Sequence, residues 1–229
     1  MIKDPPLLTV RREFPRPTPQ QLAALGSIPT GYAVDAMDGR GALDHRIKPL
    51  ERPKKPMIGI AVTCHCGPAD NLALFAALAA ARPGDILVAA TDAFAATAIV
   101  GDLFMGMARN RGIAGLVTDG MVRDLAGILA VGVPVYCAGL TPNSPVRNGP
   151  GTVGLPVVLG GVSVDSGDVL VGDDDGVVVI PRLQLHQVIA RLAEVRAAEA
   201  ALEAKVKAGL EIPDFIETIL ASDRIARVD

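Results

Sequence analysis

Residues 101–124 read GDLFMGMARNRGIAGLVTDGMVRD, and this stretch predicts the unit on which the rest of the fold is built. Its first half is typical of a helix of about three turns, and a short apolar strand follows at Ile113–Thr118. The strand ends in the glycine turn Asp119–Gly120, and the pair Arg123–Asp124 comes shortly after it. Ligands of α/β proteins bind beyond the carboxyl ends of strands, and helix N-termini attract anions. We therefore predict that this stretch holds the active site, with the carboxylate of Asp102 near the helix start.

The segments around this stretch repeat its alternation of helix and strand. Apolar runs of strand length lie at Met57–Cys64, Asp85–Thr91 and Val133–Cys137, and helix-forming runs separate them. From Ile58 to Cys137 the predicted order is therefore β-α-β-α-β-α-β. This order requires a mainly parallel sheet with right-handed crossovers, which is an α/β fold.

The pattern changes after about Ala138. Thr141–Gly151 is rich in turn-forming residues, and short β-rich pieces separated by glycine turns follow it. We expect these pieces to form an antiparallel β layer, with strands at 155–159, 162–164, 169–171 and 176–180. Pro181 then opens a long helix that ends at about Ala208, since Gly209 is a stop signal.

These patterns divide the chain into three predicted parts. They are an extended N-terminal arm (1–17), one α/β domain (18–209) and a C-terminal tail helix (210–229).

The composition excludes several classes of protein. Half of the 229 residues are hydrophobic, which predicts a folded core, but only 3% are aromatic, so stacking platforms for single-stranded nucleic acid are not expected. The net charge is −3 without a basic block, which argues against a nucleic-acid partner. No run is apolar and long enough for a signal core or a membrane span. Three cysteines, an odd number, favour a reducing, cytoplasmic setting.

Several segments together resemble the RraA-like family, which includes the class II, metal-dependent pyruvate aldolases that act on 4-hydroxy-4-methyl-2-oxoglutarate and 4-carboxy-4-hydroxy-2-oxoadipate. The matching segments, in chain order, are Pro68-Ala69-Asp70-Asn71, Pro83–Val88, Asp119-Gly120-Met121-Val122-Arg123-Asp124 and Gly167–Pro181. The resemblance spans about Ala24 to Gly209. It implies a swivelling fold of α/β/β/α layers, assembled as a homotrimer or homohexamer with sites at subunit boundaries.

One spacing separates the enzymes of this family from its non-catalytic regulators, which bind a ribonuclease. The aldolases carry an acidic residue, twenty intervening residues and then Arg-Asp, whereas the regulators tend to have glycine at the acidic position. In this chain the twenty residues 103–122 separate Asp102 from Arg123–Asp124. The chain therefore resembles the catalytic members.

The resemblance also implies roles for single residues. Asp124 would bind a divalent cation, Mg²⁺ or Mn²⁺, while Asp102 and Glu199 would act through water, Glu199 from an adjacent subunit. Oxygen ligands and retained waters are what such hard cations prefer. Arg123 would lie against the 2-oxo oxygen and neutralise the developing enolate. Arg123, Asp102 and Glu199 are thus the predicted catalytic residues.

The remaining predicted residues contact the substrate. The helix start at Gly101, with the backbone N–H groups of Leu103 and Phe104, would receive the C1 carboxylate. Asn71 lies in a loop that the family places beside the substrate.

Simpler structural roles compete with these assignments. Arg123–Asp124 could be a surface ion pair that caps the next helix. Asp102 could have no role beyond stabilising the helix through its favourable interaction with the helix dipole. Glu199 could be one of several solvated glutamates on the long helix, and Asn71 could be a helix cap.

The implied reaction is retro-aldol cleavage of a 4-hydroxy-2-oxo di- or tricarboxylic acid, such as 4-hydroxy-4-methyl-2-oxoglutarate, which releases pyruvate during aromatic-compound catabolism. Oxaloacetate decarboxylation would accompany it, since loss of CO₂ from C3 yields the same enolate. The alternatives are a ribonuclease-binding regulator, or a decarboxylase or lyase acting on another 2-oxo acid.

Cys64-His65-Cys66 raises a separate metal hypothesis. A closed zinc site needs four ligands, and no matching pair of ligands lies elsewhere in the sequence. We expect instead that these residues lie near the wall of the pocket.

Overall fold

The computed structural model describes residues 4–228 and divides into two compact units, Met1–Leu192 and Ala193–Asp229. Residues 1–3 of the predicted arm and residue 229 of the predicted tail lie outside the described residues.

The centre of the first unit is the parallel sheet that the sequence predicts. Its strands β3 (Met57–Cys66), β4 (Asp85–Ala90), β6 (Gly115–Thr118) and β8 (Val135–Cys137) lie in this order and pair in parallel. The helices between them are α3 (Leu72–Ala80), α4 (Asp102–Asn110) and α5 (Leu125–Val131). The predicted order β-α-β-α-β-α-β is therefore confirmed, as is the α/β fold class.

Further strands extend this sheet beyond β3 and β8. β10 (Gly151–Val153) and β13 (Val169–Asp173) both pair antiparallel with β3, at its two ends. β14 (Gly176–Ile180) adds to β13, and β2 (Lys48–Pro49) adds to β8. The predicted antiparallel strands are thus present, and of these β13 and β14 are continuous with the main sheet. β11 (Val157–Leu159) and β12 (Val162–Val164) form a separate antiparallel pair.

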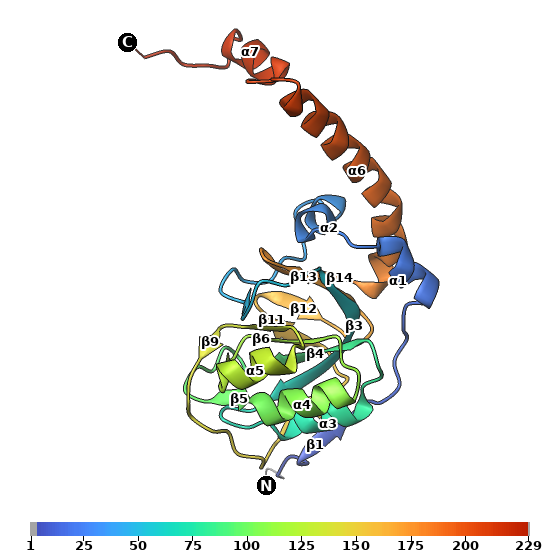
Figure 1. The fold of residues 1–229 in the computed structure, drawn as a ribbon, viewed down its shortest axis with the longest axis vertical. Helices are drawn as coiled ribbons and strands as arrows, with labels where there is room; N and C mark the ends of the chain where they lie inside the picture. Colours follow the sequence, from blue (N-terminus) through green and yellow to red (C-terminus); the bar gives the residue numbers. More distant parts are fainter. Residues whose placement is uncertain (1–3, 229) are drawn as a thin grey trace. The chain divides into compact units, whose positions relative to one another are not determined.

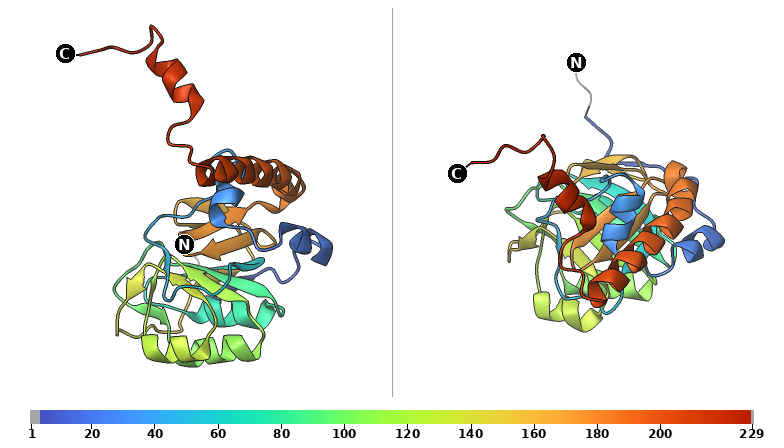
Figure 2. Two further views of the ribbon diagram at one scale, coloured as in Figure 1. Left: turned by 45° about the horizontal axis from the view of Figure 1, so that its top comes forward. Right: turned by 90° about the horizontal axis from the view of Figure 1, so that it is seen from above.

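Both faces of the parallel strands are buried, which explains their continuous apolar sequences. Along β3, Val62, Cys64 and Cys66 face one side and pack with α3, α4 and α5. Ala61, like Ile86 and Val88 of β4, faces the other side and packs with β11 and β12. Figures 1 and 2 show the resulting layers of the first unit, with α3, α4 and α5 on one face of the sheet.

The N-terminal arm is extended and lies on its own chain. Its strand β1 (Leu8–Val10) pairs in parallel with β10. Arg11 donates from Nε to the carbonyl of Gly154 and pairs with Asp165 at 2.6 Å. Further along, Arg16 makes a bidentate ion pair with the buried carboxylate of Asp85, at 2.6 and 2.9 Å. The arm is therefore fixed to the first unit at several points.

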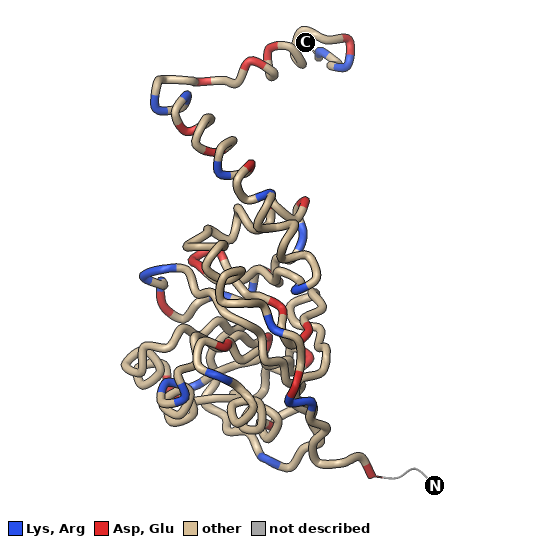
Figure 3. The backbone as a smooth tube through the Cα atoms, turned by 90° about the vertical axis from the view of Figure 1, so that its right-hand side faces the viewer, with Lys and Arg blue, Asp and Glu red and all other residues tan. Residues whose placement is uncertain are grey.

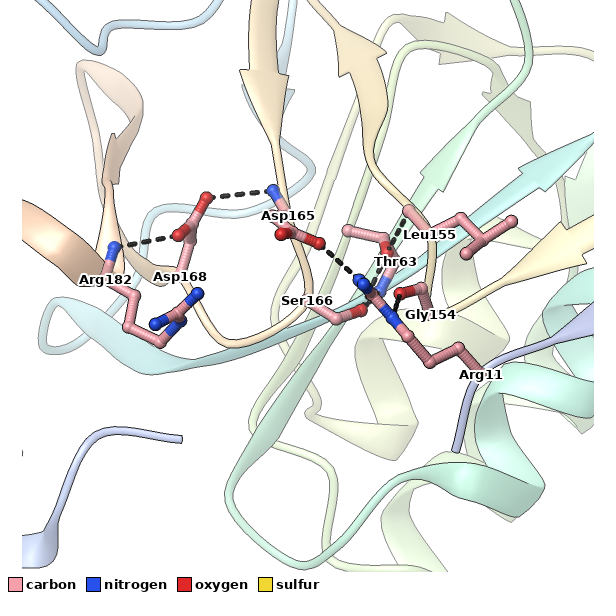
Figure 4. Close-up of polar contacts among 8 residues, drawn as sticks. All are labelled: Arg11, Thr63, Gly154, Leu155, Asp165, Ser166, Asp168 and Arg182. Atoms are coloured by element: carbon pink, nitrogen blue, oxygen red, sulfur yellow. Dashed lines mark hydrogen bonds and ion pairs between the residues drawn. The ribbon is translucent and has the colours of Figure 1, made fainter. Parts of the chain in front are cut away.

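A polar network joins the arm, β3 and the turn before β13 (Figure 4). The hydroxyl of Thr63 donates to the carbonyl of Leu155 at 2.6 Å and lies 2.7 Å from Ser166 Oγ. The carboxylate of Asp168 accepts the backbone N–H groups of Asp165 and Arg182, at 2.9 and 2.8 Å. Burial raises the pKa of Asp168 above its ordinary value. The network therefore holds the turn that leads into β13.

Two short helices, α1 and α2, follow the N-terminal arm. α1 (Pro19–Leu25) starts at a capping box on Thr18 and has proline at its first position. α2 (Thr30–Ala36) packs on the β13–β14 pair. The connection from α2 to β3 is rich in proline and, apart from β2, is irregular.

The long helix starts later than predicted. A 3-10 turn, Arg182–Gln184, follows Pro181, and α6 (Leu185–Lys207) begins after it. The second unit contains the end of α6 and α7 (Asp214–Leu220), and Gly209 ends α6 with φ +98°. Figure 3 shows acidic and basic residues interspersed along this part of the chain. In residues 4–228, none of the helices combines the length and the apolar character that crossing a membrane requires.

Candidate active site

A small sheet brings the two halves of residues 101–124 together. β5 (Ala98–Val100) precedes α4, and it pairs in parallel with β7 (Met121–Val122), which precedes Arg123. β9 (Gly139–Leu140) completes this sheet. The backbone N–H of Arg123 donates to the carbonyl of Val100 at 3.0 Å. The start of α4 and the pair Arg123–Asp124 therefore lie side by side, although twenty residues separate Asp102 from Arg123.

A cavity of about 190 Å³ opens at this point. It is smaller than the roughly 300–1,000 Å³ of sites for drug-sized ligands, so it suits a small organic acid. Seven of the eight predicted site residues line it: Asn71, Gly101, Asp102, Leu103, Phe104, Arg123 and Asp124.

Asp124 adopts an unusual backbone conformation at the start of α5. Its φ of 59° and ψ of 46° lie in the left-handed region, and its side chain does not cap the helix. Left-handed non-glycine residues are uncommon and cluster at functional sites. The simpler alternative was an ion pair that caps the next helix. The ion pair is present, with Arg123 Nε 3.2 Å from Asp124 Oδ2, but the side chain of Asp124 makes no capping hydrogen bond.

Gly101 makes room for this carboxylate. A Cβ at this position would collide with Asp124 Oδ2 and would lie 3.2 Å from Arg123 Nε. The φ of Gly101 is −133°, which any residue adopts, so the requirement for glycine comes from space and not from backbone strain. Arg123 also donates from Nη1 to Ser144 Oγ, in the turn-rich segment after β9. The guanidinium is thus held by contacts on both sides.

Asp102 occupies the first position of α4, where a carboxylate is favoured by the helix dipole. Its Oδ1 accepts the N–H of Leu103 at 2.7 Å. A Cβ on Gly127 of α5 would lie 2.6 Å from Asp102 Oδ2, so this glycine provides the space for the carboxylate. The backbone N–H of Leu103, which was predicted to bind the substrate carboxylate, thus already donates to Asp102. Substrate binding at this N–H stays a prediction.

Asn71 precedes α3 but does not serve as its cap. Its Nδ2 donates to the carbonyl of Ile99 at 2.7 Å, which fixes the side chain against β5. Its Oδ1 is buried and has no hydrogen-bond partner in the described part of the chain. Because an unsatisfied buried acceptor is costly, this oxygen is a candidate for contact with a ligand.

The acidic groups of the pocket can be tested as a site for a hard cation. Asp102 and Asp124 offer oxygen ligands only, which is the donor chemistry that Mg²⁺ and Mn²⁺ prefer. Residues 4–228 contain no group of three or more His, Cys, Asp or Glu side chains that could hold a metal ion. The residues of one chain therefore fit a cation that keeps several of its waters, and they do not form a closed cage.

The sequence matches a family model over residues 30–179, described as RraA-like: Aldolase/RraA. The chain belongs to the RraA-like family. It is 38% identical over 177 residues to a protein of Halalkalibacterium halodurans named "Putative 4-hydroxy-4-methyl-2-oxoglutarate aldolase", an alignment that covers 77% of this chain and 84% of the relative.

Two solved structures share the fold. RraAS2 of Streptomyces coelicolor, described as an unusual member of the RNase ES inhibitor RraA protein family, is 28% identical with a TM-score of 0.74, covering 83% of this chain and all of that one. An uncharacterized protein of Pseudomonas syringae has a TM-score of 0.75 at 23% identity, covering 86% and 96% of the two chains, which shows the fold alone.

Glu199 is the one predicted site residue of this RraA-like chain that the cavity does not include. It lies exposed on α6 in the second unit, Ala193–Asp229. Its predicted role in the site of an adjacent subunit stays a prediction.

The predicted position of the cysteines in this RraA-like protein is wrong. Cys64 and Cys66 were expected near the pocket wall, but they are buried in the core between β3 and the helices and do not line the cavity. Consecutive strand residues point to opposite faces, so His65 lies on the other side, 3.0 Å from Asp92 Oδ2. A hydrogen bond between the two thiols, together with burial, raises the pKa of Cys64.

Sequence reasoning missed part of the pocket lining. The additional residues are Phe75, Ile99, Val100, Met107, Pro145 and Arg147. Pro145 and Arg147 come from the turn-rich segment Thr141–Gly151, whose position depends on long-range contacts. The one signal in the sequence was an arginine, Arg147, within this turn-forming segment.

Proposed function

We propose that this protein is a divalent-metal-dependent lyase that cleaves a 4-hydroxy-2-oxo di- or tricarboxylic acid, such as 4-hydroxy-4-methyl-2-oxoglutarate, and releases pyruvate. The observation that supports this most is the convergence of Arg123, Asp124 and Asp102 on one small cavity. The name of the Halalkalibacterium halodurans relative points to the same reaction.

A divalent cation fits the pocket's carboxylates. Asp124 would be its direct ligand, while Asp102 and the Glu199 of an adjacent subunit would act through water. When bound, Mg²⁺ or Mn²⁺ supplies a Lewis acid that polarises the 2-oxo group of the substrate.

The chain's own residues then stabilise the charge that develops. Cleavage breaks the bond between C3 and C4, the C4 hydroxyl loses its proton and becomes a carbonyl, and the electron pair moves into the pyruvate enolate. Arg123 lies in the pocket with its guanidinium fixed by Asp124 and Ser144, so it offers a cation to the enolate oxygen without reorganisation. The carboxylate of Asp102 is the candidate proton acceptor, and a proton returned to C3 yields pyruvate.

The same enolate forms when oxaloacetate loses CO₂ from C3, so we also propose oxaloacetate decarboxylase activity. The test is a coupled assay for pyruvate, with each substrate, in the presence of Mg²⁺ or Mn²⁺ and again with a chelator. We expect metal-dependent pyruvate from both substrates. Absence of pyruvate under all of these conditions would refute the proposal.

A second candidate function is regulation of a ribonuclease without catalysis, which the similarity to the Streptomyces coelicolor structure favours. That protein is described as an unusual member of a family of RNase ES inhibitors. The carboxylate of Asp102 in the pocket argues against it. A binding assay between this protein and a purified RNase E-type endonuclease separates the two functions, since a lyase needs no such partner.

We also propose that the protein assembles as a homotrimer or homohexamer, because the predicted site requires Glu199 from a second copy. A divalent-metal lyase acting on a small acid has no need for nucleic acid or a membrane.

A further inference from the structure

The cavity contains a second guanidinium that the reaction described above does not use. Arg147 lines the cavity together with Arg123, but it comes from the turn-rich segment after β9. Arg123 is paired with Asp124, at 3.2 Å. By contrast, Arg147 has no carboxylate partner among the residues that the structure describes.

An aromatic pair supports the Arg147 side chain. Its guanidinium carbon lies 5.0 Å from the centre of the Phe75 ring, within the range of a cation–π contact. Phe75 in turn packs edge-to-face on Phe104 of α4, with ring centres 5.1 Å apart and an angle of 89°. Both phenylalanines line the same cavity. The charge is thus held at the cavity by contacts that leave its hydrogen-bond donors unused.

The backbone on both sides of Arg147 is fixed as well. The N–H of Val146 donates to the carbonyl of Ala69 at 2.7 Å, and the carbonyl of Val146 accepts the N–H of Asn71 at 3.0 Å. On the other side, Oδ2 of the buried Asp70 accepts the N–H groups of Asn148 and Gly149. Arg147 therefore lies in a turn whose backbone is already held by hydrogen bonds. Ligand binding does not have to pay the entropy cost of ordering this turn.

We infer that Arg147 binds the second carboxylate of the substrate, the one beyond C4, and so selects dicarboxylic over monocarboxylic 2-oxo acids. A guanidinium matches a carboxylate with two parallel N–H donors. Arg147 is exposed and lines the cavity, so its donors are free for an anion that enters there. The buried Oδ1 of Asn71, which lines the same cavity, cannot accept from a carboxylate and is left for a donor group such as a hydroxyl. This inference rests on the proposed function, since it places a 2-oxo acid in the cavity.

The test compares two acids of equal chain length, 2-oxoglutarate and 2-oxopentanoate, which differ only in the terminal carboxylate. Calorimetry with Mg²⁺ present measures their affinities for the wild type, Arg147→Gln and Arg147→Lys. We expect the wild type to bind 2-oxoglutarate about ten- to a hundredfold more tightly, as a charged hydrogen bond predicts. Arg147→Gln should reduce that preference to about twofold or less, and Arg147→Lys should retain part of it.

Arg46→Gln provides the matched control, because it makes the same change at an exposed arginine outside the cavity. It should leave the preference unchanged. A wild type without preference, or an Arg147→Gln variant that keeps it, would overturn the inference. Loss of affinity for both acids in equal proportion would assign Arg147 a structural role and would also overturn it.

Pyruvate release from 4-hydroxy-4-methyl-2-oxoglutarate separates this inference from the proposed function. With Arg147→Gln we expect the KM to rise about tenfold or more while kcat changes little. A wild type that prefers 2-oxoglutarate through Arg147 but releases no pyruvate would contradict the proposed function alone. A wild type that releases pyruvate with the same KM as Arg147→Gln would contradict the inference alone.

Discussion

Gly101 and Asp124 show how a residue without a side chain can shape the candidate site. The carboxylate of Asp124 occupies the space that a Cβ on Gly101 would take, and Arg123 lies against the same position. The sequence spacing singled out Asp102, Arg123 and Asp124, but only the pairing of β5 with β7 explains why Gly101 must be small.

Gly101→Ala should therefore reduce pyruvate release by about a hundredfold or more, because displacing Asp124 removes a fixed electrostatic partner from the site. Gly106→Ala, on the same helix, is the matched control: a Cβ there meets nothing within 4 Å. It should keep activity and raise the free energy of unfolding by about 0.5–1 kcal/mol, the helix preference for alanine. Steady-state kinetics and denaturant titration measure both effects. Full activity in Gly101→Ala would contradict the proposed crowding.

The thiol of Cys137 predicts a pH dependence of stability. Burial raises the pKa of Cys137 from 9.0 to about 11, so the folded state favours the neutral thiol. This contribution to stability is full below pH 9 and is lost as pH rises towards 11, and it amounts to about 2–3 kcal/mol. Denaturant titrations between pH 8 and pH 11 should show a smaller decrease for Cys137→Ala than for the wild type. An equal decrease in both would contradict the assignment.

At the scale of elements, the parallel strands and their helices could be predicted because each signal is local. Thr18-Pro19 starts α1, and continuous apolar runs mark β3 and β4. The short strands β5 and β7 could not be predicted, since three apolar residues or fewer give no periodicity and their pairing is long-range. The same limit hid Arg147, whose place depends on the contacts of Asp70 with its turn.

The N-terminal arm gives a prediction at this scale. Arg16 satisfies the carboxylate of Asp85, which is only 2% exposed at the start of β4. Arg16→Ala should lower the free energy of unfolding by about 3 kcal/mol, because it leaves a buried charge without its partner. Arg12→Ala, at an exposed arm position, should change it by no more than about 0.5 kcal/mol. Equal effects of the two substitutions in denaturant titrations would show that the arm is not held by this ion pair.

At the scale of the whole molecule, the proposed site is shared between copies. The cavity of one chain supplies Asp102, Arg123 and Asp124, whereas Glu199 lies in the separate unit Ala193–Asp229. A chain read alone cannot show which copy completes which site. The resemblance alone, and not the geometry of a single chain, therefore predicts the role of Glu199.

Complementation between inactive variants tests the shared site. We expect Asp124→Ala and Glu199→Gln each to be nearly inactive as pure oligomers. After the two are mixed, dissociated and reassembled, some sites combine an intact Asp124 with an intact Glu199 from a neighbour, and activity should return to a measurable fraction of the wild type. Light scattering should give three or six times the chain mass of 23.7 kDa. A mixed oligomer without activity, or a fully active Glu199→Gln, would contradict a site shared in this way.

The central claim is that Asp124 and Arg123 form the reactive centre of a metal-dependent lyase. The most direct test is the rate of pyruvate release from 4-hydroxy-4-methyl-2-oxoglutarate with Mg²⁺, compared between the wild type and Asp124→Asn, which preserves the shape of the side chain. Asp174→Asn, at an exposed aspartate outside the cavity, is the control. We predict a loss of about a thousandfold or more for Asp124→Asn and no loss for the control. An Asp124→Asn variant as active as the wild type would contradict the account.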